Sequence, residues 1–267
     1  MKLTIIGVGG LGSALASGVL GVVGDSGPSG AGGAFEVTLC ARREGTLDPF
    51  RGRARLVLDA RAAVADADVV VLAVKPRGTP ELLAHVAPAL RGDAVVVSCA
   101  AGVPLQRLVG HGAVARAMPN IGAQRRASTT ALCLGRGCTG ERDLPRLRAV
   151  FAAVGAVHVV EDEGWFHAIT AVGASGPAFL LLACEALVDG AVEQGLPRSD
   201  ALVWARAALI ASAARLDERV EPQTLRALVT SPAGTTAAGL AQLEDRGTRA
   251  AGPAAVRAAV QRSRELG

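Results

Sequence analysis

The residues with the clearest chemical pattern lie at the start of the chain, where Gly7-Val8-Gly9-Gly10-Leu11-Gly12 has the spacing G-x-G-x-x-G. This stretch directly follows a short apolar run, residues 3–6, and opens a helix expected over residues 11–23. In that setting the first glycine allows a tight turn, the second lets a pyrophosphate approach the backbone, and the third allows close helix–strand packing. The amino end of the helix attracts phosphate charge. The sequence therefore predicts a dinucleotide site formed by Ile6, Gly7, Val8, Gly9, Gly10, Leu11 and Gly12.

The end of the second expected strand, residues 35–40, indicates which dinucleotide binds. Sites for NAD usually place an acidic residue there, against the ribose 2′-hydroxyl. Here the chain continues Ala41-Arg42-Arg43, and guanidinium groups suit a 2′-phosphate. This favours NADPH, with NADH still possible. Arg42 and Arg43 could instead be ordinary solvated charges, one of them paired with Glu44.

The elements that must position these residues alternate between short apolar runs and amphipathic stretches. Strands are expected at residues 3–6, 35–40, 55–58, 69–74, 94–98, 114–118, 131–134 and 156–160. Helices are expected at 11–23, 59–66, 80–90 and 142–154, with a surface loop at 24–34. Alternating strands and helices indicate an α/β fold with a doubly wound parallel sheet.

The strand pattern ends after the acidic residues 161–163, and Ala/Leu-rich helical segments follow. Helices are expected at 167–190, 199–216, 223–228 and 235–266, the last broken at Gly247 and Pro253. We therefore expect a dinucleotide-binding domain at 1–162 and an all-helical domain at 163–267. A helical domain this apolar needs a partner, and the simplest is a second copy in a homodimer.

Charge and composition exclude several other classes of function. The formal net charge is +4, but the arginines are dispersed and aromatic residues make up only 3% of the chain, so no nucleic-acid partner is expected. Only Lys2 and Lys75 are lysines, which singles out Lys75 at the end of a strand. The four histidines form no metal-like cluster, and no ordering of Ser, His and Asp suggests a hydrolytic triad.

The cysteines and the apolar segments indicate the cellular compartment in which the protein is expected. The five cysteines are odd in number and form no C-x-x-C pair, as expected for reduced thiols in a cytosolic protein. Seven glycines interrupt the uncharged residues 3–24, which argues against a signal peptide or a membrane span. We expect a soluble, cytoplasmic protein without a membrane partner.

Several further motifs, in order along the whole chain, resemble the pyrroline-5-carboxylate reductase family. They are Ala73-Val74-Lys75-Pro76, Val97-Ser98-Cys99-Ala100-Ala101-Gly102-Val103, Arg116-Ala117-Met118-Pro119-Asn120, Ala174-Ser175-Gly176-Pro177-Ala178-Phe179 and Ser231-Pro232-Ala233-Gly234-Thr235-Thr236. The resemblance implies an N-terminal Rossmann fold and a C-terminal helical domain that interlocks into dimers or higher homo-oligomers. It also implies NAD(P)H-dependent reduction of a cyclic imine acid, 1-pyrroline-5-carboxylate, to L-proline.

The resemblance also implies roles for particular residues. The cofactor's nicotinamide half would be bordered by Ala73, Val74, Lys75, Pro76, Cys99, Ala100, Ala101 and Asn120. The substrate would meet Ser175, Gly176, Ser231, Gly234, Thr235 and Thr236, the loop at 231–236 cradling its carboxylate ahead of a helix at 236–243. Thr236 would hydrogen-bond or protonate the imine nitrogen, and Lys75 is the second candidate catalytic residue. The same loop could simply be a helix start capped by Ser231 or Thr235.

Several positions depart from the family pattern, and four of them leave the substrate open. Thr-Pro is replaced by Ile121-Gly122, and glycines are replaced by Ala174 and Ala233. Alanine at 233 matters if that backbone needs a positive φ. Two alternatives therefore remain: a reductase of another cyclic imine acid or a small 3-hydroxy acid, and a nucleotide-binding regulator without catalysis.

Overall fold

The computed structural model describes residues 1–24, 35–108, 112–216 and 220–267. Within these residues the chain forms two compact units. The first comprises Met1–Ser175 together with Ala259–Gly267, and the second comprises Gly176–Ala258. Most of the surface loop expected at 24–34 lies outside the described residues.

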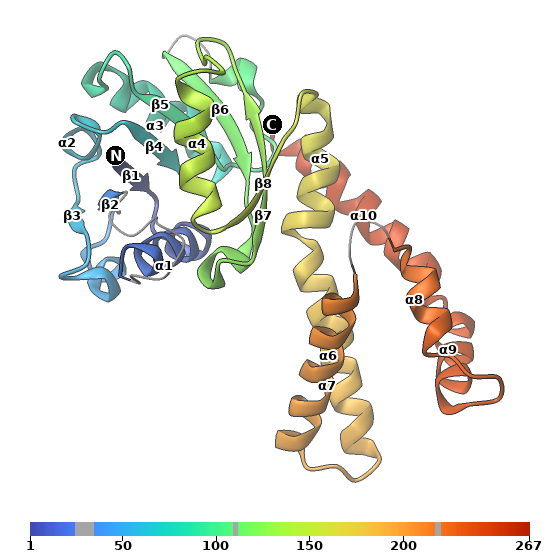
Figure 1. Ribbon diagram of the computed structural model, residues 1–267. Helices are drawn as coiled ribbons and strands as arrows, with labels where there is room; N and C mark the ends of the chain where they lie inside the picture. The colour runs from blue at the N-terminus through green and yellow to red at the C-terminus, as the bar shows by residue number, and fades with distance from the viewer. Residues whose placement is uncertain (25–34, 109–111, 217–219) are drawn as a thin grey trace. The chain divides into compact units, whose positions relative to one another are not determined.

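The first unit is built on one eight-stranded sheet with the order β3-β2-β1-β4-β5-β6-β7-β8 (Figure 1). The strands are β1 Lys2–Ile6, β2 Glu36–Cys40, β3 Arg55–Val57, β4 Val69–Leu72, β5 Val95–Ser98, β6 Ala113–Met118, β7 Ser128–Leu134 and β8 Gly155–Val159. All eight expected strands are present, with ends shifted by a few residues. The order places β2 and β3 on one side of β1 and β4 to β8 on the other, which confirms a Rossmann-type doubly wound sheet.

One strand pair corrects the expectation of a parallel sheet. β6 and β7 are antiparallel, with Ala115 opposite Leu134, whereas every other neighbouring pair is parallel. Parallel strands need a long crossover, usually a helix, and only a short 3-10 turn, η6 (Ile121–Arg125), separates these two strands. The sheet is therefore parallel-dominated rather than wholly parallel.

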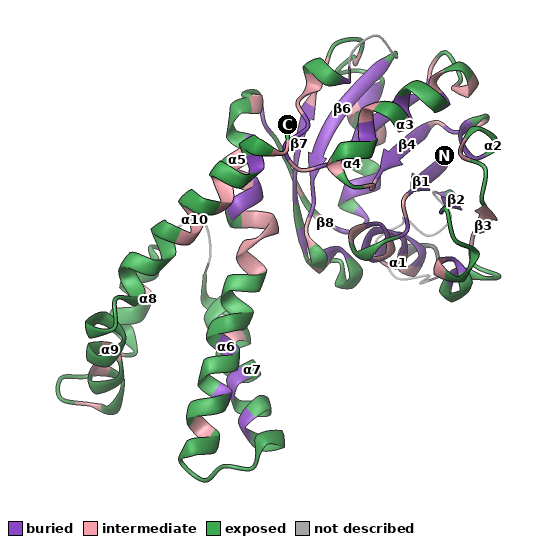
Figure 2. Ribbon diagram, turned by 180° about the vertical axis from the view of Figure 1, so that it is seen from behind, coloured by how far each residue is buried: buried purple, intermediate pink, exposed green. Residues whose placement is uncertain are grey.

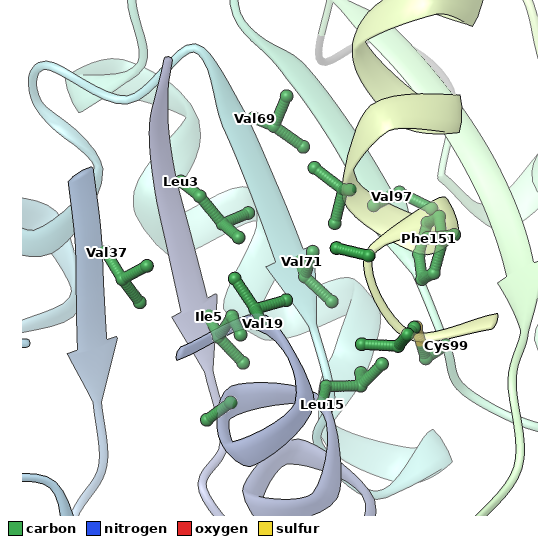
Figure 3. Close-up of a cluster of buried hydrophobic side chains, with 14 of the residues drawn as sticks. Leu3, Ile5, Leu15, Val19, Val37, Val69, Val71, Val97, Cys99 and Phe151 are labelled. Atoms are coloured by element: carbon green, nitrogen blue, oxygen red, sulfur yellow. The ribbon is translucent and has the colours of Figure 1, made fainter. Parts of the chain in front are cut away.

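Helices cover both faces of the sheet, and each face has its own apolar core. One core joins the sheet to α1 (Gly10–Gly24) and α4 (Asp143–Ala152), through side chains such as Leu15 and Phe151 (Figure 3). The other joins it to α2 (Ala60–Val64) and α3 (Thr79–Val86). Burial on both faces explains why the central strands read as unbroken apolar runs.

The first unit ends in short helical turns and includes the last residues of the chain. After β8 come η7 (Glu163–Trp165), α5 (Phe166–Ile169) and a π-helical turn, η8 (Thr170–Ala174). Residues 259–267 contain the end of α10 (Thr248–Glu265). The His167 ring nitrogen Nδ1 lies 2.9 Å from the hydroxyl of Ser263, which ties this final segment to α5.

The described residues of the second unit form helices and the loops that connect them, with no strand, as expected. It contains α6 (Gly176–Glu193), α7 (Arg198–Arg215), α8 (Pro222–Leu228), α9 (Thr235–Asp245) and most of α10. Gly247, at φ +76°, separates α9 from α10 and confirms the expected break. The break expected at Pro253 is wrong, since this proline lies inside α10. It has no N–H to bond to the Arg249 carbonyl, yet the helix continues past it.

The second unit buries little of its apolar surface. Its core is a small cluster between α6 and α7, made of Cys184, Val188, Ala201 and Ala205. Exposed residues extend along both helices (Figure 2), including Leu180, Leu181, Leu182, Leu202, Val203 and Trp204. Within the described chain, one helical stretch, Glu163–Glu193, is long and apolar enough to cross a membrane by those two criteria alone.

Candidate active site

Three loops that the sequence assigns to the cofactor lie side by side at the carboxyl edge of the sheet. The Gly7 N–H donates to the Cys40 carbonyl (2.9 Å), and the Ala73 N–H donates to the Ile6 carbonyl (2.8 Å). The Cys99 N–H in turn donates to the Leu72 carbonyl (2.9 Å). The loops after β1, β4 and β5 therefore follow one another along the edge where open α/β sheets bind their ligands.

The glycine turn between β1 and α1 has the shape that a phosphate needs. Gly7 has φ +99°, and a Cβ there would lie 2.8 Å from the Ala73 carbonyl oxygen. A Cβ on Gly12 would collide with the carbonyl of Gly7. In contrast, a Cβ on Gly9 or Gly10 would meet open space. The turn is thus packed on its inner side and open at the start of α1, where helix N–H groups lack intrahelical partners.

Arg42 and Arg43, after β2, are exposed and have no ion-pair partner among the described residues. The possibility that Glu44 neutralises one of them is wrong, because its Oε1 lies 2.8 Å from Nη2 of Arg51. Both guanidinium groups therefore remain available to an anion at the end of the strand that usually meets the ribose.

The loop after β4 presents Lys75 to solvent. Its carbonyl accepts hydrogen bonds from the buried Thr79 hydroxyl (3.2 Å) and the Gly78 N–H (3.1 Å), which fix the turn into η3 (Pro76–Gly78). No acidic side chain contacts the Lys75 ammonium group within the described residues. Val74 and Pro76 beside it are half-buried.

The loop after β5 offers its backbone rather than a thiol. The Cys99 side chain packs in the core with Leu15 and Phe151 (Figure 3), and burial raises its pKa to about 12. The thiol is therefore buried and neutral. The Ala100 N–H donates to the Ser98 hydroxyl (3.2 Å), and Ala101 beside it is half-exposed.

Asn120, at the end of β6, has a clear structural task. Its Oδ1 accepts from the Gly122 N–H (2.9 Å), and its Nδ2 donates to the Gly173 carbonyl (3.0 Å). The side chain thereby ties η6 to η8. Its predicted contact with the cofactor stays a prediction.

The loop Ser231–Thr236 lies in the second unit and begins α9. The cap of that helix is Gly234, without a side-chain cap bond, so the alternative that Ser231 or Thr235 caps it is wrong. Ala233 has φ +58°, a left-handed conformation that favours glycine. A Cβ on Gly234 would strike the Ser231 hydroxyl, which brings the backbone at the helix start close to that group.

The hydroxyls of Ser231, Thr235 and Thr236 have no hydrogen-bond partner in the described part of the chain, and all three residues are exposed. The loop therefore offers unpaired hydroxyl and helix-start N–H donors, a set that suits a carboxylate. Ser175 closes the first unit, its N–H donating to the Thr170 carbonyl (2.9 Å), and Gly176 opens α6 in the second.

Sequence reasoning missed a partly buried ion pair in the first unit. Nη1 of Arg116, on β6, donates to Oε1 of Glu163 at 2.6 Å, and the Arg116 side chain is only 2% exposed. Its one signal was an arginine inside an otherwise apolar strand, which is weak evidence in a chain with so many arginines.

Comparison with known proteins identifies the family to which the chain is similar. A family model described as "Pyrroline-5-carboxylate reductase dimerisation" matches residues 163–266. The pyrroline-5-carboxylate reductase of Methanosarcina acetivorans is 36% identical over 100% of this chain and 98% of its own. The chain belongs to the pyrroline-5-carboxylate reductase family. The resemblance drawn from the sequence motifs is thereby confirmed.

Other relatives of the pyrroline-5-carboxylate reductase family extend the match. The Thermus thermophilus protein of that name is 36% identical over 100% of this chain and 99% of its own. The solved pyrroline-5-carboxylate reductase of Coxiella burnetii has a TM-score of 0.83 at 29% identity, covering 99% of this chain and 97% of its own. A second model, described as "NADP oxidoreductase coenzyme F420-dependent", matches residues 2–102 of this family member.

Proposed function

We propose that the protein reduces 1-pyrroline-5-carboxylate to L-proline with NADPH. The observation that carries this proposal is the identity of 36% over the full chain to relatives named for the reaction. The carboxyl edge formed by the loops after β1, β4 and β5 supports it, because its residues fit a dinucleotide.

The dinucleotide fits this edge in three respects. The open space at Gly9 and Gly10 lies at the start of α1 and would admit the pyrophosphate. Arg42 and Arg43 would bind the 2′-phosphate, which favours NADPH over NADH. Residues Ala73 to Pro76 and Cys99 to Ala101 would border the nicotinamide and its ribose, with Asn120 nearby.

Bound NADPH would supply the hydride that adds to the imine carbon. The protein's own task is to hold the imine there, to place a proton on its nitrogen and to exclude water. The Ser231–Thr236 loop would bind the substrate carboxylate through the N–H groups at the start of α9, with Ser175 and Gly176 at the start of α6. The Thr236 hydroxyl would donate to the imine nitrogen.

Lys75 is the second residue proposed to act in the reaction. Its exposed ammonium lacks an acidic partner in the described structure. Lys75 follows β4, which pairs with the strand that leads into the glycine turn. We assign it to the binding of negative charge carried by the cofactor or the substrate, close to the reacting ring.

We also propose how the chain is divided and where it works. Residues 1–162 would bind the cofactor, and residues 163–267 would bind substrate and form a homodimer through the exposed apolar faces of α6 and α7. The five cysteines, none in a disulfide, suit a reducing cytoplasm. A small molecule and a second copy are the proposed partners, without nucleic acid or membrane.

A substrate assay tests the proposal. Purified protein is mixed with 1-pyrroline-5-carboxylate and with NADPH or NADH, and oxidation of the cofactor is followed by absorbance. We expect turnover with both reagents present and a preference for NADPH. No turnover above background with either cofactor would contradict the proposal.

A reductase of another cyclic imine acid is the second candidate. The observation that favours it is the altered surroundings of the substrate, Ile121, Gly122, Ala174 and the left-handed Ala233. A panel with a six-membered cyclic imine acid and small 3-hydroxy acids separates the two. Binding of NADPH without reduction of any of them would instead favour a regulator.

A further inference from the structure

A buried cation is fixed beside the carboxyl edge of the sheet. The guanidinium of Arg116 donates to Glu163 Oε1 and lies 4.6 Å from the ring centroid of Phe166. Among the described residues, Nε and Nη2 of Arg116 have no hydrogen-bond partner. Glu163 is therefore the counter-charge of a cation that is costly to leave unpaired, and this fixes the position of its carboxylate.

The same carboxylate oxygen also binds the loop that follows β5. The Leu105 N–H donates to Glu163 Oε1 at 2.7 Å. Leu105 begins a short 3-10 helix, η5 (Leu105–Arg107), and its loop starts at Cys99, in the segment proposed to border the nicotinamide. Glu163 thus holds the far end of a loop whose near end lies on the carboxyl edge of the sheet.

The middle of this loop is held from another direction. Gly102 has φ +79°, and a Cβ there would collide with the Ser263 carbonyl and lie 2.8 Å from Leu266 Cβ. Arg107 Nη1 donates to the Gly267 carbonyl at 2.6 Å. Residues 259–267 therefore leave the loop little room, and the Glu163 contact holds its end at Leu105.

We propose that Glu163 is a positioning residue for the loop from Cys99 to Leu105 and, through it, for the nicotinamide half of the cofactor. The proposal rests on the proposed function for the identity of the cofactor. The phosphate turn at Gly7–Gly12 does not depend on Glu163. Loss of the Leu105 contact therefore slows hydride transfer, because the reacting atoms are misaligned, and leaves NADPH affinity intact.

Two double variants isolate the contact to Leu105. R116M/E163Q and R116M/E163M both remove the two charges of the ion pair. Glutamine keeps an oxygen that accepts from the Leu105 N–H, whereas methionine does not. We expect kcat of R116M/E163M to be about 10-fold to 100-fold below that of R116M/E163Q, with equal dissociation constants for NADPH. Hydrogen exchange at the Leu105 amide should also be faster in R116M/E163M.

A second pair of variants tests the donor and leaves the ion pair in place. L105P removes the N–H, and proline suits this position because Leu105 is the first residue of η5 and Pro104 before it is extended (ψ 159°). L105A removes the same side chain and keeps the N–H. We expect L105P to lose kcat as R116M/E163M does, and L105A to retain more of it.

The control is E161Q, which removes an exposed carboxylate from the same segment without touching Arg116 or Leu105. It should match the unmodified protein in kcat and in Leu105 exchange. Equal kcat and equal Leu105 exchange in both double variants would overturn the proposal, as would equal kcat in L105P and L105A.

Failure of the proposed function would look different. The protein would then turn over no imine, while NADPH affinity, Leu105 exchange and the fluorescence of bound NADPH could still be measured. A difference in exchange and fluorescence between the two double variants would support the role of Glu163. No difference would overturn it.

Discussion

Glu44 pairs with Arg51, with 2.8 Å between Oε1 and Nη2, and not with either arginine at the end of β2. Arg51 also forms an ion pair with Asp48 at 2.8 Å, so Glu44 and Asp48 both pair with Arg51. Arg42 and Arg43 consequently keep their positive charge unpaired within the described chain, at the position where a 2′-phosphate would lie.

Charge reversal at this position tests the cofactor preference. Arg42→Glu should weaken NADPH binding about 10-fold to 100-fold, the worth of a charge-assisted hydrogen bond of ~1.5–3 kcal/mol, and change NADH binding far less. Dissociation constants for both cofactors from fluorescence titration check this. Arg53→Glu, on an exposed arginine of the same segment, is the matched control. Unchanged NADPH affinity in Arg42→Glu would show that the assignment is wrong.

The Thr236 hydroxyl is proposed to donate to the imine nitrogen. Thr236→Ala should lower kcat/KM for the imine about 100-fold, the lower end of what a positioned proton donor contributes. NADPH affinity should change little, because the proposed partner of this hydroxyl is the substrate and not the cofactor. Steady-state kinetics with Thr236→Ser as the control decide it, since serine retains the hydroxyl. Equal rates for alanine and serine would remove Thr236 from the mechanism.

Ala233 provides a stability test that is independent of activity. Its φ of +58° costs an alanine energy that glycine avoids, although glycine is more flexible in the unfolded chain. Ala233→Gly should therefore raise the free energy of unfolding by about 0.5–1 kcal/mol, measured by urea titration. Ala241→Gly, inside α9, should lower it by a similar amount. A loss of stability in Ala233→Gly would contradict the left-handed conformation.

His167 makes the first unit sensitive to acid. Burial, and then the charges of Arg116 and Arg264, lower its pKa from the ordinary value of 6.5, against an opposing effect of Glu163. Because the folded protein favours the neutral ring, the stabilisation is complete above 6.5 and is lost as pH falls through the lowered pKa. His167→Gln should therefore reduce the loss of stability between about pH 7.5 and about pH 5.

Urea midpoints at several pH values give this comparison for the His167 variant. His158→Gln, on an exposed histidine of β8, should follow the unmodified protein. The same loss of stability on acidification in His167→Gln as in the unmodified protein would count against this source of acid sensitivity.

The strands of the sheet could be predicted because each one is encoded by the apolar pattern of its own short stretch of sequence. Apolar runs such as Val69–Leu72 need burial on both faces, and the amphipathic stretches between them supply it. The direction of β7 could not be predicted from its own residues. That direction depends on how the chain crosses from β6, and the expected alternation of strands and helices did not account for the short turn at Ile121–Arg125.

The candidate site divides in the same way. A motif of adjacent residues such as Gly7–Gly12 can be recognised from the sequence directly. The structure places this motif on one edge of the sheet with Ala73 and Cys99. The Arg116–Glu163 pair left no comparable signal, since the partners are far apart in sequence and neither residue type is unusual here. Likewise, the cap at Gly234 depends on backbone angles that the residue types alone did not specify.

The core between α6 and α7 is small, so the stability of the second unit should depend on protein concentration as well as on the chain's own contacts. Four residues form that core, while leucines on the same helices remain in water. If a second copy covers those leucines, their burial stabilises the folded unit only when the two copies associate. Folding is then coupled to association by mass action. The midpoint of thermal unfolding should then rise with protein concentration, and dilution alone should weaken the helical unit.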